Sequence, residues 1–196
     1  MKMTILILAA GKSSRMGQPK QLLKWGNKTL IQQSIETALA SVCPTVYCVI
    51  GANAAAIKSN ISAYPVQLVE NPNYQEGLSS SIIAGIQALE KDQIDAVLIM
   101  LADQPKITAS HLNDLIASFQ ANPHLAVATA YEKNLGVPAL FSKQHFESLK
   151  ALSGDKGARM LLKQLDKTIN RVPFSVLADI DTPEDYRDLL DNEEEV

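Results

Sequence analysis

Three cationic side chains, Lys12, Arg15 and Lys20, follow the first apolar run of the sequence. That run, residues 4–8, is typical of a fully buried parallel strand, and small residues follow it as far as Gly11. Small residues let backbone N–H groups come close to a phosphate, and arginine and lysine add charge-assisted contacts. In an open α/β sheet, ligands bind beyond the carboxyl ends of the strands. The spacing therefore predicts an anion-binding loop of the nucleotide kind.

Two familiar phosphate loops do not fit this stretch. A P-loop ending at Gly11 would need a glycine where Leu6 stands, and a dinucleotide fingerprint would need glycines at Ser13 and Met16. An ordinary glycine turn with solvated cations is the simpler alternative. The presence of Gly17 and a further lysine after a buried strand makes that alternative much weaker.

Aspartates near two other segments could hold a divalent cation. Asp103 comes directly after the apolar run 95–101, at the edge of the sheet where the first loop also opens. It could instead be a turn or helix-capping residue. Asp179 and Asp181 flank Ile180 in a strand-like alternation, so one of them is expected to face the site.

A third polar segment, 77–81, precedes an apolar-periodic helix. Gly77 is followed by the hydroxyls of Ser79, Ser80 and Ser81. We expect a strand-to-helix loop with hydroxyls and backbone N–H groups available to a ligand. The alternative is that a serine only caps the helix; one serine is expected to do so, and three exceed that need.

Apolar periodicity alternates between strands and helices along most of the chain. Strands are expected at 4–8, 46–50, 66–69, 95–101, 126–129 and 135–141. Helices are expected at 30–39 behind a Thr29–Gln32 capping box, at 54–61, around 82–89, at 110–120, from a Ser142 cap to Leu149, from 153–159 to near Leu165, and after Thr182. The pattern predicts an α/β fold: one three-layer αβα sandwich with a mostly parallel, Rossmann-like sheet. The domain is expected at 1–190, followed by an acidic tail at 191–196.

Composition excludes several classes of protein. The net charge of −3 argues against a general nucleic-acid binder. No apolar run approaches the length of a membrane span, and no signal peptide precedes the first strand, so a cytoplasmic location is expected. Cys43 and Cys48 are expected to be buried thiols rather than a disulfide. His111, His124 and His145 lack metal-ligand spacing and are expected at the surface.

The motif L-A-A-G-x-S-x-R-M-G-x-x-K resembles the signature loop of nucleotidyltransferases related to molybdenum cofactor biosynthesis, which share the fold of sugar-phosphate nucleotidyltransferases. Within that group, Leu8 to Gly11 resembles the cytidylyltransferases, because guanylyltransferase relatives typically have a second glycine at Ala10. The segments N-P-x-x-x-E-G-x-x-x-S, L-x-D-Q-P, G-x-P-x-x-F, G-D-K-G-A-R and T-P-E-D are similar to the same family in the same order. Val137 departs from it, since many relatives carry histidine there.

The resemblance implies nucleotidyl transfer, in which an acceptor phosphate attacks the α-phosphorus of a nucleoside triphosphate. Arg15, Lys20 and Asp103 would be catalytic, and Asp103 and Asp181 would hold Mg²⁺, or Mn²⁺ in its place. The nucleotide would be bound by Ala9, Ala10, Gly11, Ser13, Ser14, Arg15, Met16, Lys20, Gly77, Ser79, Ser80 and Ser81.

The resemblance also implies the partners of the reaction. CTP is the expected nucleotide, a choice that the methyl group of Ala10 favours because it narrows the space for a base. The expected acceptor is molybdopterin, and the product would pass to a molybdenum hydroxylase. Three alternatives stay open: use of GTP, transfer to a sugar phosphate or another phosphorylated alcohol, and a non-catalytic chaperone that hands over the cofactor.

Overall fold

The computed structural model describes every residue except 44, 133, 176–178 and 192–196. Strands and helices alternate along it, which confirms the predicted α/β class. The strands are β1 (Met3–Leu8), β2 (Lys24–Trp25), β3 (Lys28–Thr29), β4 (Val46–Ile50), β5 (Gln67–Glu70), β6 (Ala96–Leu101), β7 (Ala126–Tyr131), β8 (Asn134–Ser142) and β9 (Ile169–Pro173). The helices are α1 (Leu30–Leu39), α2 (Ala54–Asn60), α3 (Leu78–Lys91), α4 (Ala109–Ala121), α5 (Phe146–Lys150), α6 (Ala158–Gln164) and α7 (Pro183–Asp191).

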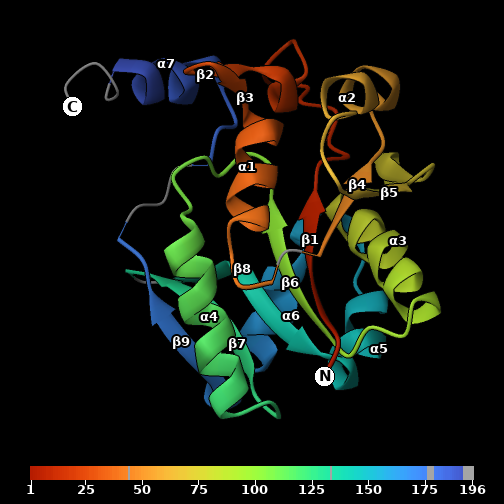
Figure 1. The fold of residues 1–196 in the computed structure, drawn as a ribbon, viewed down its shortest axis with the longest axis vertical. Helices are drawn as coiled ribbons and strands as arrows, with labels where there is room; N and C mark the ends of the chain where they lie inside the picture. Colours follow the sequence, from red (N-terminus) through yellow and green to blue (C-terminus); the bar gives the residue numbers. More distant parts are fainter. Residues whose placement is uncertain (44, 133, 176–178, 192–196) are drawn as a thin grey trace.

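Seven strands form one sheet in the order β5-β4-β1-β6-β8-β7-β9 (Figure 1). All neighbouring pairs are parallel except the two that β8 makes, with β6 and with β7. The mostly parallel sheet is therefore confirmed, and β6 is its central strand, as its apolar sequence predicts. Ile5 of β1 is in register with Val46 on one side and Leu98 on the other, and all three side chains belong to the same buried core.

Each face of the sheet is covered by its own helices, which completes the predicted sandwich. One apolar core joins the sheet to α1, α2 and α4, and Figure 1 shows α1 and α4 crossing the near side. The other core joins it to α3, α5 and α6. The strands β1 and β6 are buried on both faces, which explains why they read as continuous apolar runs.

A smaller apolar cluster lies at the edge of the fold where the chain ends. It joins Met16 of the first loop to Leu30, Ile180 and Leu189, so the loop, α1 and α7 pack together. The Tyr186 hydroxyl on α7 also donates to the backbone oxygen of Lys24 on β2, at 2.5 Å. These contacts bring the last described helix beside a segment more than a hundred and fifty residues earlier in the chain.

Several local predictions need correction. The β2–β3 hairpin and the edge strand β9 were not predicted, because short or half-exposed strands carry little apolar alternation. Ser142 does not cap α5, whose N-cap is His145. His111 is buried rather than exposed, while His145 is half-buried and His124 is exposed. Cys43 and Cys48 are buried free thiols, as expected. In the described ranges, no helix is long and apolar enough to cross a membrane.

Candidate active site

The ends of β1 and β6 bring the first loop and Asp103 to the same edge of the sheet. Leu8 and Leu101 are in register at the carboxyl ends of these parallel strands, and the N–H of Ala102 donates to Leu8 O at 3.2 Å. Gly11 and Asp103 follow these two strand ends, and both line the same cavity. The predicted meeting of these two motifs is thus confirmed by strand pairing.

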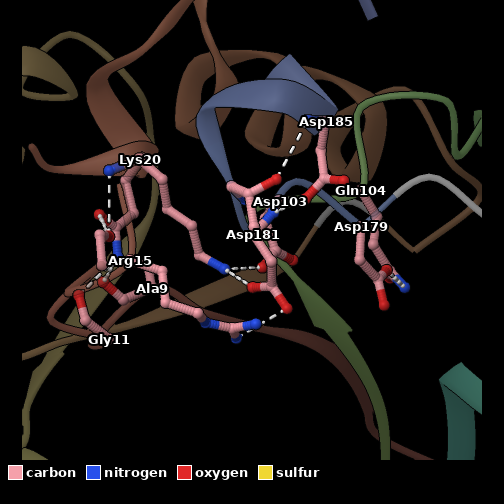
Figure 2. A network of polar contacts seen from close by, with 12 residues as sticks. Ala9, Gly11, Arg15, Lys20, Asp103, Gln104, Asp179, Asp181 and Asp185 are labelled. Carbon is pink, nitrogen blue, oxygen red and sulfur yellow. Dashed lines mark hydrogen bonds and ion pairs between the residues drawn. The ribbon is translucent and has the colours of Figure 1, made fainter. Parts of the chain in front are cut away.

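An ion-paired cluster occupies this edge (Figure 2). The Lys20 ammonium contacts Asp103 Oδ2 and also Asp181 Oδ1, the latter at 2.9 Å. Arg15 Nη2 contacts the other oxygen of Asp181, also at 2.9 Å. Lys20 is largely buried, whereas the Arg15 side chain is 68% exposed. Four of the predicted site residues therefore form one connected set.

The position of Asp181 is fixed by the backbone beside it. The N–H of Ile180 donates to Asp103 O at 3.1 Å, which ties the C-terminal segment to the end of β6. Asp185 Oδ2 accepts from the N–H groups of Asp181 and Thr182, while Thr182 Oγ1 accepts from the N–H of Asp185. This reciprocal cap confirms the predicted start of α7, and it leaves the side chain of Asp181 directed at Lys20.

The charges of the cluster reinforce one another. Burial lowers the pKa of Lys20, but Asp103 and Asp181 more than offset it, so the net pKa lies above its usual value. Burial raises the pKa of Asp181, and the hydrogen bond and charge of Lys20, with Arg15, outweigh it and bring the pKa below its usual range. Lys20 is therefore cationic and Asp181 anionic at neutral pH.

Asp103 has one carboxylate oxygen to spare. Its Oδ2 accepts from Lys20, whereas Oδ1 is buried without a hydrogen-bond partner. Mg²⁺ is usually held by one or two carboxylates together with substrate phosphates, and a spare oxygen beside Asp181 fits that requirement. Within the part of the chain that the structure describes, no three His, Cys, Asp or Glu side chains cluster as a metal site. The two carboxylates therefore suit a cation whose remaining ligands come from a bound phosphate.

Two residues near the cluster, Gln21 and Gln104, were not predicted to take part. Gln21 is buried and hydrogen-bonds to the carbonyls of Ala9 and Gly11. Gln104 Nε2 donates to Asp179 Oδ1 at 2.8 Å, so Asp181, not Asp179, belongs to the ion-paired cluster. Only the amide side chain directly after Lys20 could have drawn attention to Gln21, since a buried glutamine has no periodicity of its own.

The segment 77–81 differs from the prediction. Helix α3 already begins at Leu78, so the three serines lie in its first turn rather than in a loop, and all are buried. Gly77 is the N-cap, and no serine side chain caps the helix. The Nδ2 atom of Asn71 donates to Ser80 Oγ and Ser81 Oγ, at 2.9 and 3.1 Å. Nucleotide binding by these hydroxyls stays a prediction.

Two adjoining cavities meet at the ion-paired cluster. The first-loop cavity is lined by Ala10, Gly11, Arg15, Lys20, Gln21, Leu78, Asp103, Asp155, Asp179 and Asp181, with Leu8, Leu101 and Ala102. The β8 cavity is lined by apolar side chains, among them Ile82, Leu135 and Val137, and also by polar ones, among them Tyr131, Asp155, Lys156, Arg159, Asp179 and Asp181. Because both contain Asp181, a ligand in one lies next to a ligand in the other.

The remaining predicted residues of the first loop play different parts. Met16 packs into the small apolar cluster, and Ser14 is exposed and outside the lining of both cavities. Ser13 has φ 55°, and its Oγ accepts from the N–H of Lys20 at 3.0 Å. These residues shape the loop, while Arg15 and Lys20 carry its charge into the first-loop cavity.

Residues 5–169 match the MobA-like NTP transferase domain family. The chain belongs to this family. As a MobA-like NTP transferase it is a nucleotidyltransferase, and its similarity extends over nearly the whole chain.

Three curated relatives are similar over almost their full lengths. Purine catabolism protein PucB of Bacillus subtilis is 34% identical, over 92% of each chain. Nicotine blue oxidoreductase of Paenarthrobacter nicotinovorans is 30% identical, over 95% of this chain and 96% of its own. Molybdenum cofactor cytidylyltransferase of Escherichia coli is 26% identical, over 92% of each chain. These three relatives are thus similar to the chain over almost their full lengths, although their names indicate different activities.

Solved structures of similar proteins agree with this fold. A Mycobacterium sp. strain JC1 homologue of Rv0371c from Mycobacterium tuberculosis has a TM-score of 0.84 at 29% identity, over 98% of this chain and 97% of its own. Rv0371c itself, in complex with manganese, has a TM-score of 0.78 at 26% identity, over 97% of this chain and 98% of its own. A relative of the same fold therefore binds a divalent cation.

Proposed function

We propose that this nucleotidyltransferase is a CTP:molybdopterin cytidylyltransferase that releases pyrophosphate. The observation that carries the proposal is the meeting of two cavities at one ion-paired cluster. A transfer between two substrates needs their reacting phosphates side by side, and Asp181 borders both spaces. Holding two reactants in contact removes much of the entropic cost of the reaction.

The triphosphate would occupy the first-loop cavity. Lys20 and Arg15 are the cations that border it, and in the free protein both are paired with Asp181. A triphosphate would compete for these cations, and Lys20 would stabilise the charge that develops on the α-phosphate. The acceptor oxygen forms a bond to the α-phosphorus while the bond to the bridging oxygen of pyrophosphate breaks, so the α-phosphorus needs charge stabilisation and positioning more than a protein nucleophile.

Asp103 and Asp181 are the residues that we expect to hold Mg²⁺. The spare Oδ1 of Asp103 and the exposed side of Asp181 are the available carboxylate atoms. A magnesium ion bound there with the triphosphate would supply further charge neutralisation at the reacting phosphates. The manganese complex of Rv0371c supports a divalent cation on this fold.

The β8 cavity would receive the acceptor. Its lining combines apolar side chains with Tyr131, Lys156, Arg159 and three aspartates, which suits an acceptor that has an apolar face, hydrogen-bonding groups and a phosphate. The similarity to the molybdenum cofactor cytidylyltransferase over 92% of each chain supports a molybdopterin acceptor, a cytidine nucleotide and delivery to a molybdenum hydroxylase.

The choice of base is the finer part of the proposal. Ala10 lines the first-loop cavity, and glycine in its place would leave more room for a purine. Pockets that differ by one methyl group discriminate by only ~1–3 kcal/mol, so on this contact alone we expect a preference for CTP over GTP of about 10- to 200-fold.

Competition between the two nucleotides tests the proposal. CTP and GTP at equal concentration would be incubated with the protein, Mg²⁺ and molybdopterin, and the dinucleotide products separated by chromatography. We expect the cytosine product in excess. An excess of the guanine product would overturn the cytidylyl assignment and leave nucleotidyl transfer standing, while transfer only to a sugar phosphate would overturn the acceptor.

The relative named nicotine blue oxidoreductase raises the question of redox chemistry. A chain that binds a dinucleotide through the usual fingerprint needs glycines that the first loop lacks at Ser13 and Met16. The ion-paired cluster, by contrast, provides the cations and carboxylates that phosphate transfer uses. We therefore favour transfer over redox chemistry for this site.

A further inference from the structure

Both polar atoms of the Gln21 side-chain amide form hydrogen bonds with residues of the first loop. The side chain is 2% exposed, and its Nε2 donates to Ala9 O at 3.1 Å and to Gly11 O at 2.9 Å. Its Oε1 accepts from Ser13 Oγ at 3.4 Å. In Figure 2, Ala9 and Gly11 lie below Lys20, the residue before Gln21.

The orientation of this amide follows from its partners. Two carbonyl oxygens can only accept, so the group between them must supply two N–H donors, and in glutamine that is the NH₂ group. A glutamate of the same shape would place an acceptor against both carbonyls. The position therefore requires a neutral amide and not merely a side chain of that volume.

Fixing a carbonyl also fixes the N–H of the next residue, because each peptide group is planar and trans. Gln21 holds the carbonyls of Ala9 and Gly11, and the N–H of Ala52 holds that of Ala10 at 3.1 Å. Three successive peptide groups are thus oriented. In the described ranges of the chain, the N–H groups of Ala10, Gly11 and Lys12 donate to no protein acceptor.

Successive N–H groups without protein partners can together bind an anion, and Ala10 and Gly11 border the first-loop cavity. The same side chain reaches Lys20 as well, because the hydroxyl of Ser13 that bonds to Gln21 also accepts from the N–H of Lys20. The buried amide of Gln21 therefore orients the backbone N–H groups of the first loop and also helps to fix the backbone of Lys20.

We propose that Gln21 is a positioning residue, which orders the N–H groups of residues 10–12 and the backbone of Lys20 for the triphosphate before it binds. This inference rests on the proposed function only in that a nucleoside triphosphate occupies the first-loop cavity. It does not depend on the base, because the ordered groups are backbone donors.

Two variants separate positioning from packing. Gln21→Glu keeps the shape and turns the donors into acceptors, whereas Gln21→Met keeps a straight side chain and removes the hydrogen bonds. Gln120→Met is the matched control, because Gln120 is an exposed glutamine near the end of α4. The Kd values of CTP and of GTP would be measured by calorimetry, without acceptor, at a temperature where each variant is folded by circular dichroism.

We expect Gln21→Glu to weaken triphosphate binding by about 100-fold, because leaving the buried carbonyls without donors and adding acceptors against them would displace the loop. Gln21→Met should weaken it by about tenfold, because neutral hydrogen bonds are lost without new repulsion. Gln120→Met should leave the Kd unchanged. Affinity is therefore expected to fall in the order glutamine, methionine, glutamate, because methionine only removes the donors whereas glutamate also places acceptors against both carbonyls.

The proposal is overturned if both Gln21 variants, when folded, bind triphosphate within about threefold of the natural protein, since a purely structural role lowers the melting temperature and leaves the affinity of the folded protein alone. If Gln21→Glu does not fold, Gln21→Met decides the question by the same criterion. A natural protein that binds GTP more tightly than CTP would contradict the cytidylyl assignment, and the order of the Gln21 variants would still test this inference.

Discussion

Two polar clusters lie at the same edge of the sheet, and they use their polar groups differently. In the ion-paired cluster, Asp103 has a carboxylate oxygen without a protein partner, and Arg15 is mostly exposed. In the other cluster, Asn71 occupies the hydroxyls of Ser80 and Ser81, and its own Oδ1 accepts from the N–H of Asn73. We therefore expect the first cluster to receive a ligand, and the second to hold the start of α3.

The difference shows that hydroxyls and carboxylates near a helix start are not by themselves a site. The Ser79 hydroxyl is also buried without a hydrogen-bond partner, but it lines neither the first-loop cavity nor the β8 cavity, so what distinguishes the first cluster is an unpaired carboxylate oxygen on a residue that borders a cavity. Buried polar groups normally find partners, so an unpaired carboxylate oxygen indicates a partner that arrives from outside. Function and stability should accordingly respond in opposite ways to changes in the two clusters.

The largest effect is expected in the ion-paired cluster. Asp103→Asn keeps the size of the side chain and removes the charge that faces Lys20 and the expected Mg²⁺. We predict a loss of about 10²–10³ in kcat/KM for CTP, as for other groups that stabilise the transition state. Pyrophosphate release at saturating Mg²⁺ is the measurement.

Asp95→Asn is the control for that change. Asp95 lies just before the other end of β6, where its carboxylate accepts from the N–H of Lys2 at 2.7 Å. It should keep activity within about twofold of the natural protein, since exposed substitutions usually have small effects. If Asp103→Asn releases pyrophosphate nearly as fast as the natural protein, the proposed difference in function between the two clusters is wrong.

A medium effect on stability, without loss of activity, is expected in the serine cluster. Asn71→Ala leaves the buried hydroxyls of Ser80 and Ser81 without their donor, so we predict a loss of about 1–3 kcal/mol in the free energy of unfolding. Denaturant titration measures it, and Asn73→Ala, an exposed neighbour, is the control. A tenfold or greater loss of CTP affinity at unchanged stability would instead support nucleotide binding by the serines.

The smallest effect is expected at a third polar group, formed by His111 and Thr129. As in the serine cluster, its side chains form hydrogen bonds within the protein. His111 Nε2 lies 2.8 Å from Thr129 Oγ1, and that hydroxyl also donates to Pro138 O. Burial brings the pKa of His111 below its usual 6.5, with a smaller opposing effect of Asp114. Below about pH 6.5 the unfolded chain then takes up a proton more readily, so this histidine makes the protein less stable as the pH falls.

His111→Gln removes that titration and keeps a polar partner for Thr129. The difference in unfolding free energy between the natural protein and the variant should therefore narrow between pH 7.5 and pH 5. Gln120→Met, an exposed substitution that involves no titratable group, should give a constant difference. A difference for His111→Gln that is equally constant would show that the histidine does not titrate in this window.

Much of the fold could be predicted from the sequence, because buried parallel strands have unmistakable apolar runs. β4 begins and ends where predicted, and β6 is central as its composition indicates. The edge strand β9 was missed because none of its five residues is buried and its sequence has no continuous apolar run. Burial of His111 was missed for a related reason: its partner Thr129 belongs to a strand that sequence spacing cannot connect to it.

The sequence predicted which residues belong to the candidate site but not which of them contact one another. Residue types identified Arg15, Lys20, Asp103 and Asp181, and the sheet order explains why they meet. Pairing of Lys20 with both carboxylates depends on the three-dimensional position of the C-terminal segment, which no local pattern contains. The amide of Gln21 is equally invisible, since its partners are backbone carbonyls, and these have no signature in the sequence.

The central claim is that the Lys20 ammonium, held between Asp103 and Asp181, serves nucleotidyl transfer. The most direct measurement is single-turnover release of pyrophosphate from CTP, with Mg²⁺ and molybdopterin, by Lys20→Met and by Lys28→Met. Lys28 is also ion-paired, with Glu36, but it lies outside both cavities. We predict a rate loss of about 10²–10³ for Lys20→Met and less than about twofold for Lys28→Met. A loss below about tenfold for Lys20→Met would contradict the account, because a transition-state contact of this kind is worth more.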